Sequence, residues 1–226
     1  MAQLVLALDY TDATDALDMA GRVRGSVEWM KVGMELFTRE GPKMVQTLSG
    51  MGFKVMLDLK FFDIPNTVRG GVRAASRIHA DMVTVHLLGG ERMCRGAVEE
   101  IASLEHKPLL FGITVLTSME PGELPGYDDL GSLASDLAGK AETWGMDGIV
   151  CSGHEVGTIK KAHPALKCLT PGIRPADSGD DDQRRIVTPG QAVSLGSDFL
   201  VVGRPITRAQ DPAVAARAIL NEMRGV

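Results

Sequence analysis

Aromatic residues are scarce in this sequence. They make up 4% of the chain, whereas hydrophobic residues in total make up 44% and glycine occupies 26 of the 226 positions. Such a composition suits an aliphatic α/β core with many tight loops and shows no sign of disorder. The length fits one α/β barrel without a second domain.

Cysteine is rare as well. Its three positions, Cys94, Cys151 and Cys168, form an odd number and contain no Cys-x-x-Cys spacing. This pattern suggests neither a disulfide framework nor a zinc site. A reducing cytoplasm is therefore the location that we expect.

A basic excess and long apolar runs are also missing. The formal net charge is −5, whereas broad nucleic-acid binding requires a basic face. No apolar run approaches membrane-spanning length, and the amino terminus lacks both a basic region and a cleavage motif. We expect a soluble, unprocessed protein that binds neither nucleic acid nor membranes, although a few convergent Lys and Arg side chains still permit a small anionic ligand.

Short apolar runs alternate with stretches of helical periodicity along the whole chain, which is typical of parallel βα units. The expected strands are residues 4–8, 29–32, 54–60, 82–86, 109–115, 148–151, 166–169 and 199–202. Eight such units predict a (β/α)8 TIM barrel that forms a single domain over residues 1–226. The irregular stretch 170–188 is long enough to be a binding loop or lid.

The expected third strand ends in three closely spaced charges, Asp58, Lys60 and Asp63. Side chains two residues apart in a strand share a face, which would place Asp58 and Lys60 roughly 6 to 7 Å apart. An ammonium group held between carboxylates stays protonated and is able to donate a proton. From these charges alone, a salt bridge at the rim explains the pattern equally well.

Other polar residues also lie at or near the ends of expected strands, namely Asp9, Lys31, Thr117 and Arg204. Active sites of TIM barrels lie at the carboxyl ends of the strands, and the loops after strands seven and eight often bind phosphate. In those two loops the sequence offers Gly172, Arg174, Gln183, Gly203 and Arg204. Glycine lets backbone N–H groups approach an anion, and arginine binds phosphate with two hydrogen bonds. We therefore expect a phosphorylated small molecule as the ligand.

Five motifs stand in order along the chain: Asp-Leu-Lys at 58–60, Asp-Ile-Pro-Asn-Thr at 63–67, Thr-Pro-Gly-Ile-Arg-Pro at 170–175, Asp-Gln-Arg-Arg at 182–185 and Val-Gly-Arg-Pro at 202–205. Together with residues 31–37 and 116–118, they resemble the bacterial branch of the orotidine 5′-phosphate decarboxylase family over nearly the whole chain. The resemblance implies removal of CO2 from C6 of orotidine 5′-monophosphate, which gives UMP in pyrimidine biosynthesis without a cofactor or a metal.

The resemblance also implies roles for the charged residues. Lys60 would stabilise and protonate the C6 carbanion, and Asp58 would lie near the substrate carboxylate and keep Lys60 charged. Lys31 would join this array and, with Asp9, hold the ribose hydroxyls. Asp63 matches a position that reaches the site of a neighbouring subunit.

Further matched positions concern substrate binding. Thr67, like Asp63, would reach the neighbouring subunit, so we expect an obligate homodimer. Thr117 would bind the base. The positions around the phosphate are Arg174, Gln183, Gly203 and Arg204, with residues 175–185 as a closing lid.

The sequence departs from the family pattern in two places. Phe62 replaces a frequent His, and Leu87-Leu88 replaces smaller residues, which predicts altered packing near the subunit contact. Two other functions remain as alternatives. A magnesium-dependent sugar-phosphate decarboxylase or aldolase of the same barrel group would share Asp-x-Lys-x-x-Asp but lack the continuation at 63–67. A silent nucleotide-phosphate-binding barrel would lack one of the paired charges.

Overall fold

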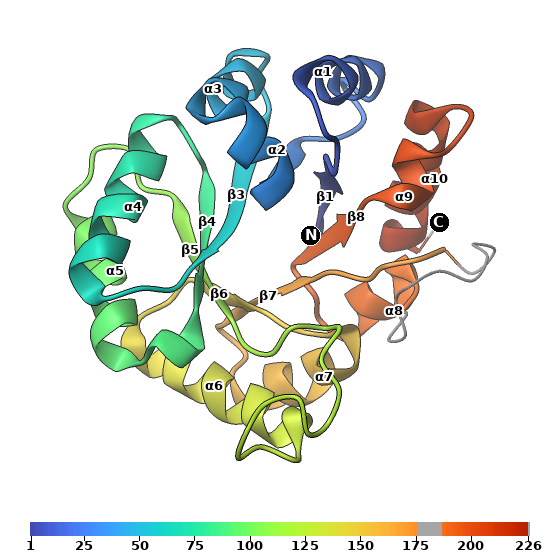
Figure 1. Cartoon of the computed structure of the whole chain (residues 1–226). Helices are drawn as coiled ribbons and strands as arrows, with labels where there is room; N and C mark the ends of the chain where they lie inside the picture. Colours follow the sequence, from blue (N-terminus) through green and yellow to red (C-terminus); the bar gives the residue numbers. More distant parts are fainter. Residues whose placement is uncertain (176–186, 226) are drawn as a thin grey trace.

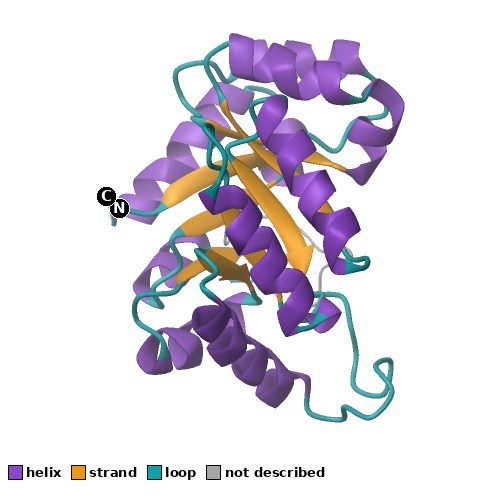
Figure 2. Cartoon of the chain, turned by 90° about the vertical axis from the view of Figure 1, so that its left-hand side faces the viewer, coloured by secondary structure: helices purple, strands orange, loops and turns teal. Residues whose placement is uncertain are grey.

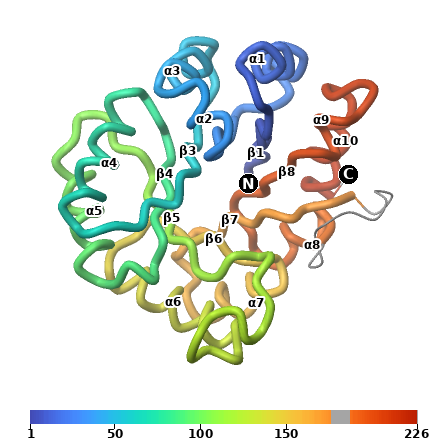
Figure 3. Tube along the Cα trace, viewed as in Figure 1, coloured from blue at the N-terminus to red at the C-terminus, as the bar shows by residue number. Residues whose placement is uncertain are grey.

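The computed structural model describes residues 1–175 and 187–225. Eight parallel strands follow one another in chain order, and β1 pairs with β8 to close a barrel (Figure 1). The first and last strands lie side by side at the closure, as the chain trace also shows (Figure 3). Helices surround this sheet on the outside (Figure 2). The predicted TIM barrel is confirmed.

The strands agree closely with the expected ranges. They are β1 Gln3–Ala7, β2 Trp29–Gly33, β3 Lys54–Phe61, β4 Met82–His86, β5 Leu109–Ile113, β6 Gly148–Val150, β7 Lys167–Thr170 and β8 Phe199–Val202. The helical elements are α1 Ala13–Arg22, α2 Met34–Glu40, α3 Pro42–Gly50, α4 Pro65–Arg77, η1 Leu87–Gly89, α5 Glu91–Ala102, α6 Leu130–Trp144, α7 Gly153–Ala162, α8 Pro189–Ser194, α9 Arg204–Thr207 and α10 Pro212–Arg224.

Helix starts follow the capping residues of the sequence. The Asp12 carboxylate accepts hydrogen bonds from the backbone N–H groups of Thr14 and Asp15, and Asp211 caps α10 in the same way. Pro65 begins α4, where its missing N–H costs no hydrogen bond. The segment after β2 forms two helices, α2 and α3. Gly41 adopts a φ of 66° between them, a conformation that glycine reaches without steric cost.

Three aromatic residues lie together inside the barrel. Trp29, Phe111 and Phe199 make edge-to-face contacts, with the Phe199 ring centroid 5.5 Å from Trp29 and 5.6 Å from Phe111. These three side chains belong to the cluster of buried residues that fills the barrel interior. A second, larger cluster lies between the sheet and the helices. The barrel interior is therefore a packed core, and in such barrels the ligand site lies at the carboxyl ends of the strands.

Leu87, one of the two departures, packs into the core, because its side chain is only 1% exposed. A Cβ atom added to Gly112 would lie 2.5 Å from Leu87 Cδ2. The large side chain at position 87 thus fits because the neighbouring strand carries glycine opposite it. The expected effect of Leu87-Leu88 on packing near the subunit contact stays a prediction.

Candidate active site

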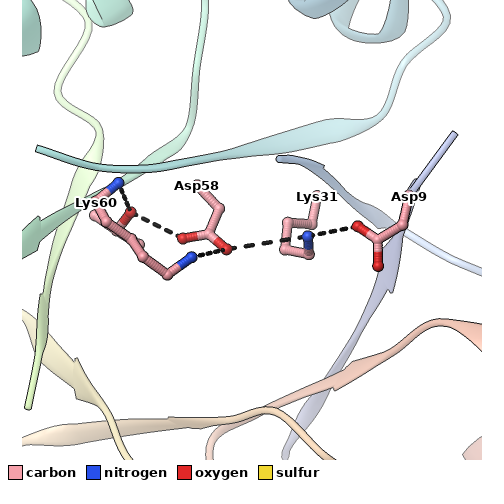
Figure 4. Close-up of polar contacts among 5 residues, drawn as sticks. Asp9, Lys31, Asp58 and Lys60 are labelled. Atoms are coloured by element: carbon pink, nitrogen blue, oxygen red, sulfur yellow. Dashed lines mark hydrogen bonds and ion pairs between the residues drawn. The ribbon is translucent and has the colours of Figure 1, made fainter. Parts of the chain in front are cut away.

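Four charged side chains of alternating sign form a row at the carboxyl ends of the first three strands (Figure 4). Lys31 Nζ lies 2.9 Å from Asp9 Oδ1 and 4.0 Å from Asp58 Oδ2. Lys60 Nζ lies 2.9 Å from the same Asp58 oxygen. The structure thus brings together Asp9, Lys31, Asp58 and Lys60, as the sequence pattern predicted.

The row exists because the strand register aligns the residues. Ala7 pairs with Lys31, and Gly33 pairs with Asp58, so the three strand ends stand next to one another. A Cβ atom on Gly33 would lie 3.1 Å from Lys31 Nζ. Glycine at position 33 therefore leaves the room that the Lys31 ammonium occupies.

Asp58 and Lys60 meet through an irregular backbone. The pairing of β3 with β4 shifts register between Leu57 and Phe61, and Lys60 has a φ of 52°. For a residue with a Cβ atom, this left-handed conformation costs about 1 to 2 kcal/mol. Simple strand alternation predicted the pairing of Asp58 and Lys60 but not this turn. Strain of this kind is often found at functional sites.

Thr84 on β4 connects to both residues, and sequence reasoning missed it. Its hydroxyl accepts a hydrogen bond from the Lys60 backbone N–H at 2.9 Å and donates one to Asp58 Oδ1 at 3.0 Å. The side chain is fully buried. The available signal was a polar residue in the middle of the apolar strand Met-Val-Thr-Val-His.

A cavity of about 250 Å³ opens beside the charged row. Its floor is apolar and includes Met56, Ile113, Val150, Leu169 and Val201. The residues with expected roles that line it are Asp9, Lys31, Asp58, Lys60, Thr117, Arg174, Gly203 and Arg204. Two arginines and a row of paired charges therefore face one cavity with an apolar floor, which suits a small ligand that carries an anionic group.

The wall from β7 and β8 offers the features of an anion site. Arg174 is 6% exposed, and Arg204 directly follows Gly203 at the end of β8. Gly172 has a φ of 77°, which residues with a side chain rarely adopt. Gln183 and the other residues of the expected lid from 176 to 185 lie outside the described part of the chain.

Asp63 and Thr67 do not join the cavity of their own chain. Both side chains are exposed, between β3 and the first turn of α4. The Asp63 carboxylate accepts a hydrogen bond from the Ile64 backbone N–H. Phe62 and Ile64 beside it are 61% and 67% exposed. Within the described residues of one chain, Asp58 is thus the carboxylate that contacts the Lys60 ammonium.

The three cysteine thiols offer no exposed nucleophile. All three cysteines are buried, and burial raises the pKa of the Cys94 thiol to about 12. Among the described residues, no three His, Cys, Asp or Glu side chains gather into a metal-binding group. No helix in this part of the chain is long and apolar enough to cross a membrane.

The positive charge of Lys60 affects the pKa of His86, which lies at the end of β4. The pKa of His86 is lowered, first because burial disfavours the imidazolium and second because the Lys60 ammonium repels it. The Phe62 ring stacks on the imidazole at a centroid distance of 5.5 Å. Because its folded-state pKa lies below the ordinary value of 6.5, His86 contributes stability that is lost as the pH falls below that value.

We expect Lys60→Ala to raise the pKa of His86, because the repulsion disappears while much of the burial remains. Lys60→Arg keeps a positive charge and should leave the pKa low. An NMR titration of the imidazole C–H signals, assigned with His86→Gln, measures both values. An unchanged pKa in Lys60→Ala would contradict a charged Lys60 near this ring.

A closed (β/α)8 barrel, a row of paired charges and an arginine-lined wall around one cavity define the class of the protein. It is a TIM-barrel protein with a site suited to a small phosphorylated ligand, at the carboxyl ends of its strands.

Comparison with known proteins identifies the family. The model of the orotidine 5′-phosphate decarboxylase / HUMPS family matches residues 2–219, and the chain belongs to this family. It is 59% identical to the orotidine 5′-phosphate decarboxylase of Nitratidesulfovibrio vulgaris (strain DP4), with 100% of this chain and 99% of the relative covered. The enzyme of that name from Lawsonia intracellularis is 54% identical, with coverage of 99% and 100%.

A solved structure of the family superimposes over the full length. The orotidine 5′-phosphate decarboxylase of Lactobacillus acidophilus matches with a TM-score of 0.88 and 34% identity, covering 99% of both chains. The family resemblance of the sequence motifs is thereby confirmed.

Proposed function

We propose that this protein removes CO2 from C6 of orotidine 5′-monophosphate and releases UMP, with Lys60 as the proton donor. The observation that carries the proposal is the Lys60 ammonium, held 2.9 Å from Asp58 at the edge of a cavity whose other wall carries Arg174 and Arg204. Full-length relatives at 59% and 54% identity that bear the name of this decarboxylase support the assignment.

The chemistry places a charge where Lys60 is able to stabilise it. When the bond between C6 and the carboxylate breaks, its electron pair stays on C6 and CO2 leaves. A fixed ammonium stabilises this carbanion, which is absent from the ground state, and therefore lowers the barrier. Lys60 then gives a proton to C6, and the neutral amine takes a proton from solvent after UMP departs.

Asp58 has two roles in this proposal. Its carboxylate at 2.9 Å favours the ammonium form of Lys60. The same carboxylate would face the substrate carboxylate, and that repulsion ends when CO2 leaves. Lys31 lies between Asp9 and Asp58, so the four side chains of the row carry two positive and two negative charges. Asp9 and Lys31 together would bind the ribose hydroxyls.

The far wall would bind the phosphate. Arg174 and Arg204 supply positive charge, and Gly203 lets the backbone approach the anion. We assign Gln183 and the lid 175–185 to the same phosphate by their match to the family motif, and Thr117 to the base. Binding energy from the phosphate, remote from C6, would then position C6 against Lys60.

We also propose that the protein works as a homodimer, in which Asp63 and Thr67 complete the site of the partner. Two observations support this arrangement. Both residues are exposed and do not line the cavity of their own chain, and the segment that carries them also exposes Phe62 and Ile64. Exposed apolar side chains of this size beside a site are typical of an interface.

Mixing two inactive variants tests the composite site. We expect Lys60→Ala and Asp63→Ala each to have little activity alone. After subunit exchange at equal amounts, half of the dimers are mixed, and each has one complete site, so about a quarter of the wild-type activity should return. Lys60→Ala mixed with Asp58→Asn is the matched control and should recover nothing, because both changes fall in the same subunit's half of the site. No recovery in mixed dimers isolated through two affinity tags would contradict the composite site.

A substrate panel separates this function from the metal-dependent alternative. Purified protein should consume orotidine 5′-monophosphate at the same rate with and without excess EDTA, and should leave ketogulonate- and hexulose-phosphates unchanged. Activity that appears only with Mg²⁺, or on the sugar phosphates, would assign the protein to the metal-dependent members of the group. Binding of UMP without any turnover would indicate a silent binding barrel.

The cytoplasmic location is proposed with this biosynthetic role.

A further inference from the structure

Thr84 links the two central residues of the site without lining the cavity. It belongs to β4, whereas Asp58 and Lys60 belong to β3. Its hydroxyl lies 3.0 Å from Asp58 Oδ1 and 2.9 Å from the Lys60 backbone nitrogen. The cavity-lining residues in the described part of the chain do not include it.

The direction of both hydrogen bonds follows from chemistry. A backbone N–H only donates, so the Thr84 oxygen accepts from Lys60. The hydroxyl donates its single proton to Asp58 Oδ1. The other Asp58 oxygen, Oδ2, contacts the Lys60 ammonium. Thr84 thus binds one oxygen of the Asp58 carboxylate and Lys60 binds the other, so the two contacts together fix the orientation of the carboxylate plane.

The Lys60 backbone needs such a partner. Its φ of 52° interrupts the regular pairing of β3 with β4. Where the strand ladder shifts, the Lys60 N–H bonds to the Thr84 side chain instead of a backbone carbonyl. The same hydroxyl therefore holds the left-handed turn that points the Lys60 side chain back toward Asp58.

We propose that Thr84 is a positioning residue for decarboxylation, which fixes the Asp58 carboxylate and the Lys60 backbone relative to each other. The inference rests on the proposed function of Lys60. A packing role alone would need only the shape of the side chain, which valine reproduces. A positioning role needs the hydroxyl, which serine reproduces.

Three variants separate the hydroxyl from the shape. Thr84→Ser keeps the hydroxyl, Thr84→Val keeps the shape, and Thr84→Ala keeps neither. We expect kcat for orotidine 5′-monophosphate to fall about 10- to 100-fold in Thr84→Val and Thr84→Ala, as for a lost hydrogen bond to a charged group. Thr84→Ser should stay within about threefold of wild type. The affinity for UMP should change little in all three, because Thr84 lies outside the cavity.

The order of the variants decides the outcome. A higher kcat in Thr84→Ser than in Thr84→Val supports a positioning role. If Thr84→Val fails to fold, comparing kcat of Thr84→Ser with that of Thr84→Ala tests the hydroxyl in the same way. The inference would be overturned if kcat of Thr84→Val equalled that of wild type. It would also be overturned if the variant that keeps the methyl groups, Thr84→Val, had a higher kcat than Thr84→Ser, which keeps the hydroxyl. Loss of UMP affinity in parallel with kcat would also overturn it. An inactive wild type would instead refute the proposed function, so the two failures are distinguishable.

Discussion

Lys60→Ala is expected to lower kcat/KM for orotidine 5′-monophosphate by about 10⁴-fold or more. The substitution removes two contributions at once, the proton donor and the fixed positive charge beside C6, each of which typically contributes 10²-fold or more. It also leaves Asp58, which is largely buried, without the ammonium now 2.9 Å away. Stopped-flow or endpoint absorbance of the orotate ring measures the loss of activity. A titration with UMP checks that the variant still binds the product.

Lys60→Arg provides the matched control for charge. Arginine keeps the positive charge but does not give up its proton in proteins. We therefore expect Lys60→Arg to bind UMP and remain nearly inactive, which separates proton donation from simple charge pairing. A Lys60→Ala protein with near-normal turnover would remove Lys60 from the reaction.

Arg204→Ala is expected to lower kcat/KM by about 10²- to 10³-fold, because a bidentate contact from arginine to phosphate combines two charge-assisted hydrogen bonds. The phosphate lies far from C6, so part of this loss should appear in kcat and not only in KM. Steady-state kinetics with the phosphorylated substrate measures both constants.

Two controls make the test specific to the phosphate. Arg208→Ala removes a nearby exposed arginine that does not line the cavity, and it should leave the kinetics unchanged. Orotidine, which lacks the phosphate, should react equally slowly with wild type and Arg204→Ala. An equal loss on both substrates would show that Arg204 acts on the fold or on the reacting group instead.

The sequence predicted the barrel and most of the site for one physical reason. Parallel strands in a closed barrel all end on the same rim, so charged residues that follow different strands must gather there. Asp9, Lys31 and Asp58 could be placed together from their strand positions alone, and the structure confirms their contacts. The arginines after β7 and β8 reach the same cavity for the same reason.

The finer geometry depends on features that pattern reasoning does not contain. Strand periodicity assumes a regular backbone, whereas Lys60 adopts a left-handed conformation where the ladder shifts. Thr84 contacts Asp58 across a strand pair, and a lone threonine in an apolar strand does not indicate its partner. The placement of Asp63 depends on a second chain, so its role stays a prediction that the mixing experiment tests.

The most direct test of the account is decarboxylation in D2O with excess EDTA, followed by ¹H NMR of the product. The Lys60 ammonium exchanges its protons with solvent, so wild type should convert orotidine 5′-monophosphate into UMP with deuterium at C6. The C6 proton signal should be absent and the C5 signal should appear as a singlet, while Lys60→Ala leaves the substrate intact. Unchanged substrate with wild type, or UMP that carries no deuterium at C6, would contradict the proposed reaction and its proton donor.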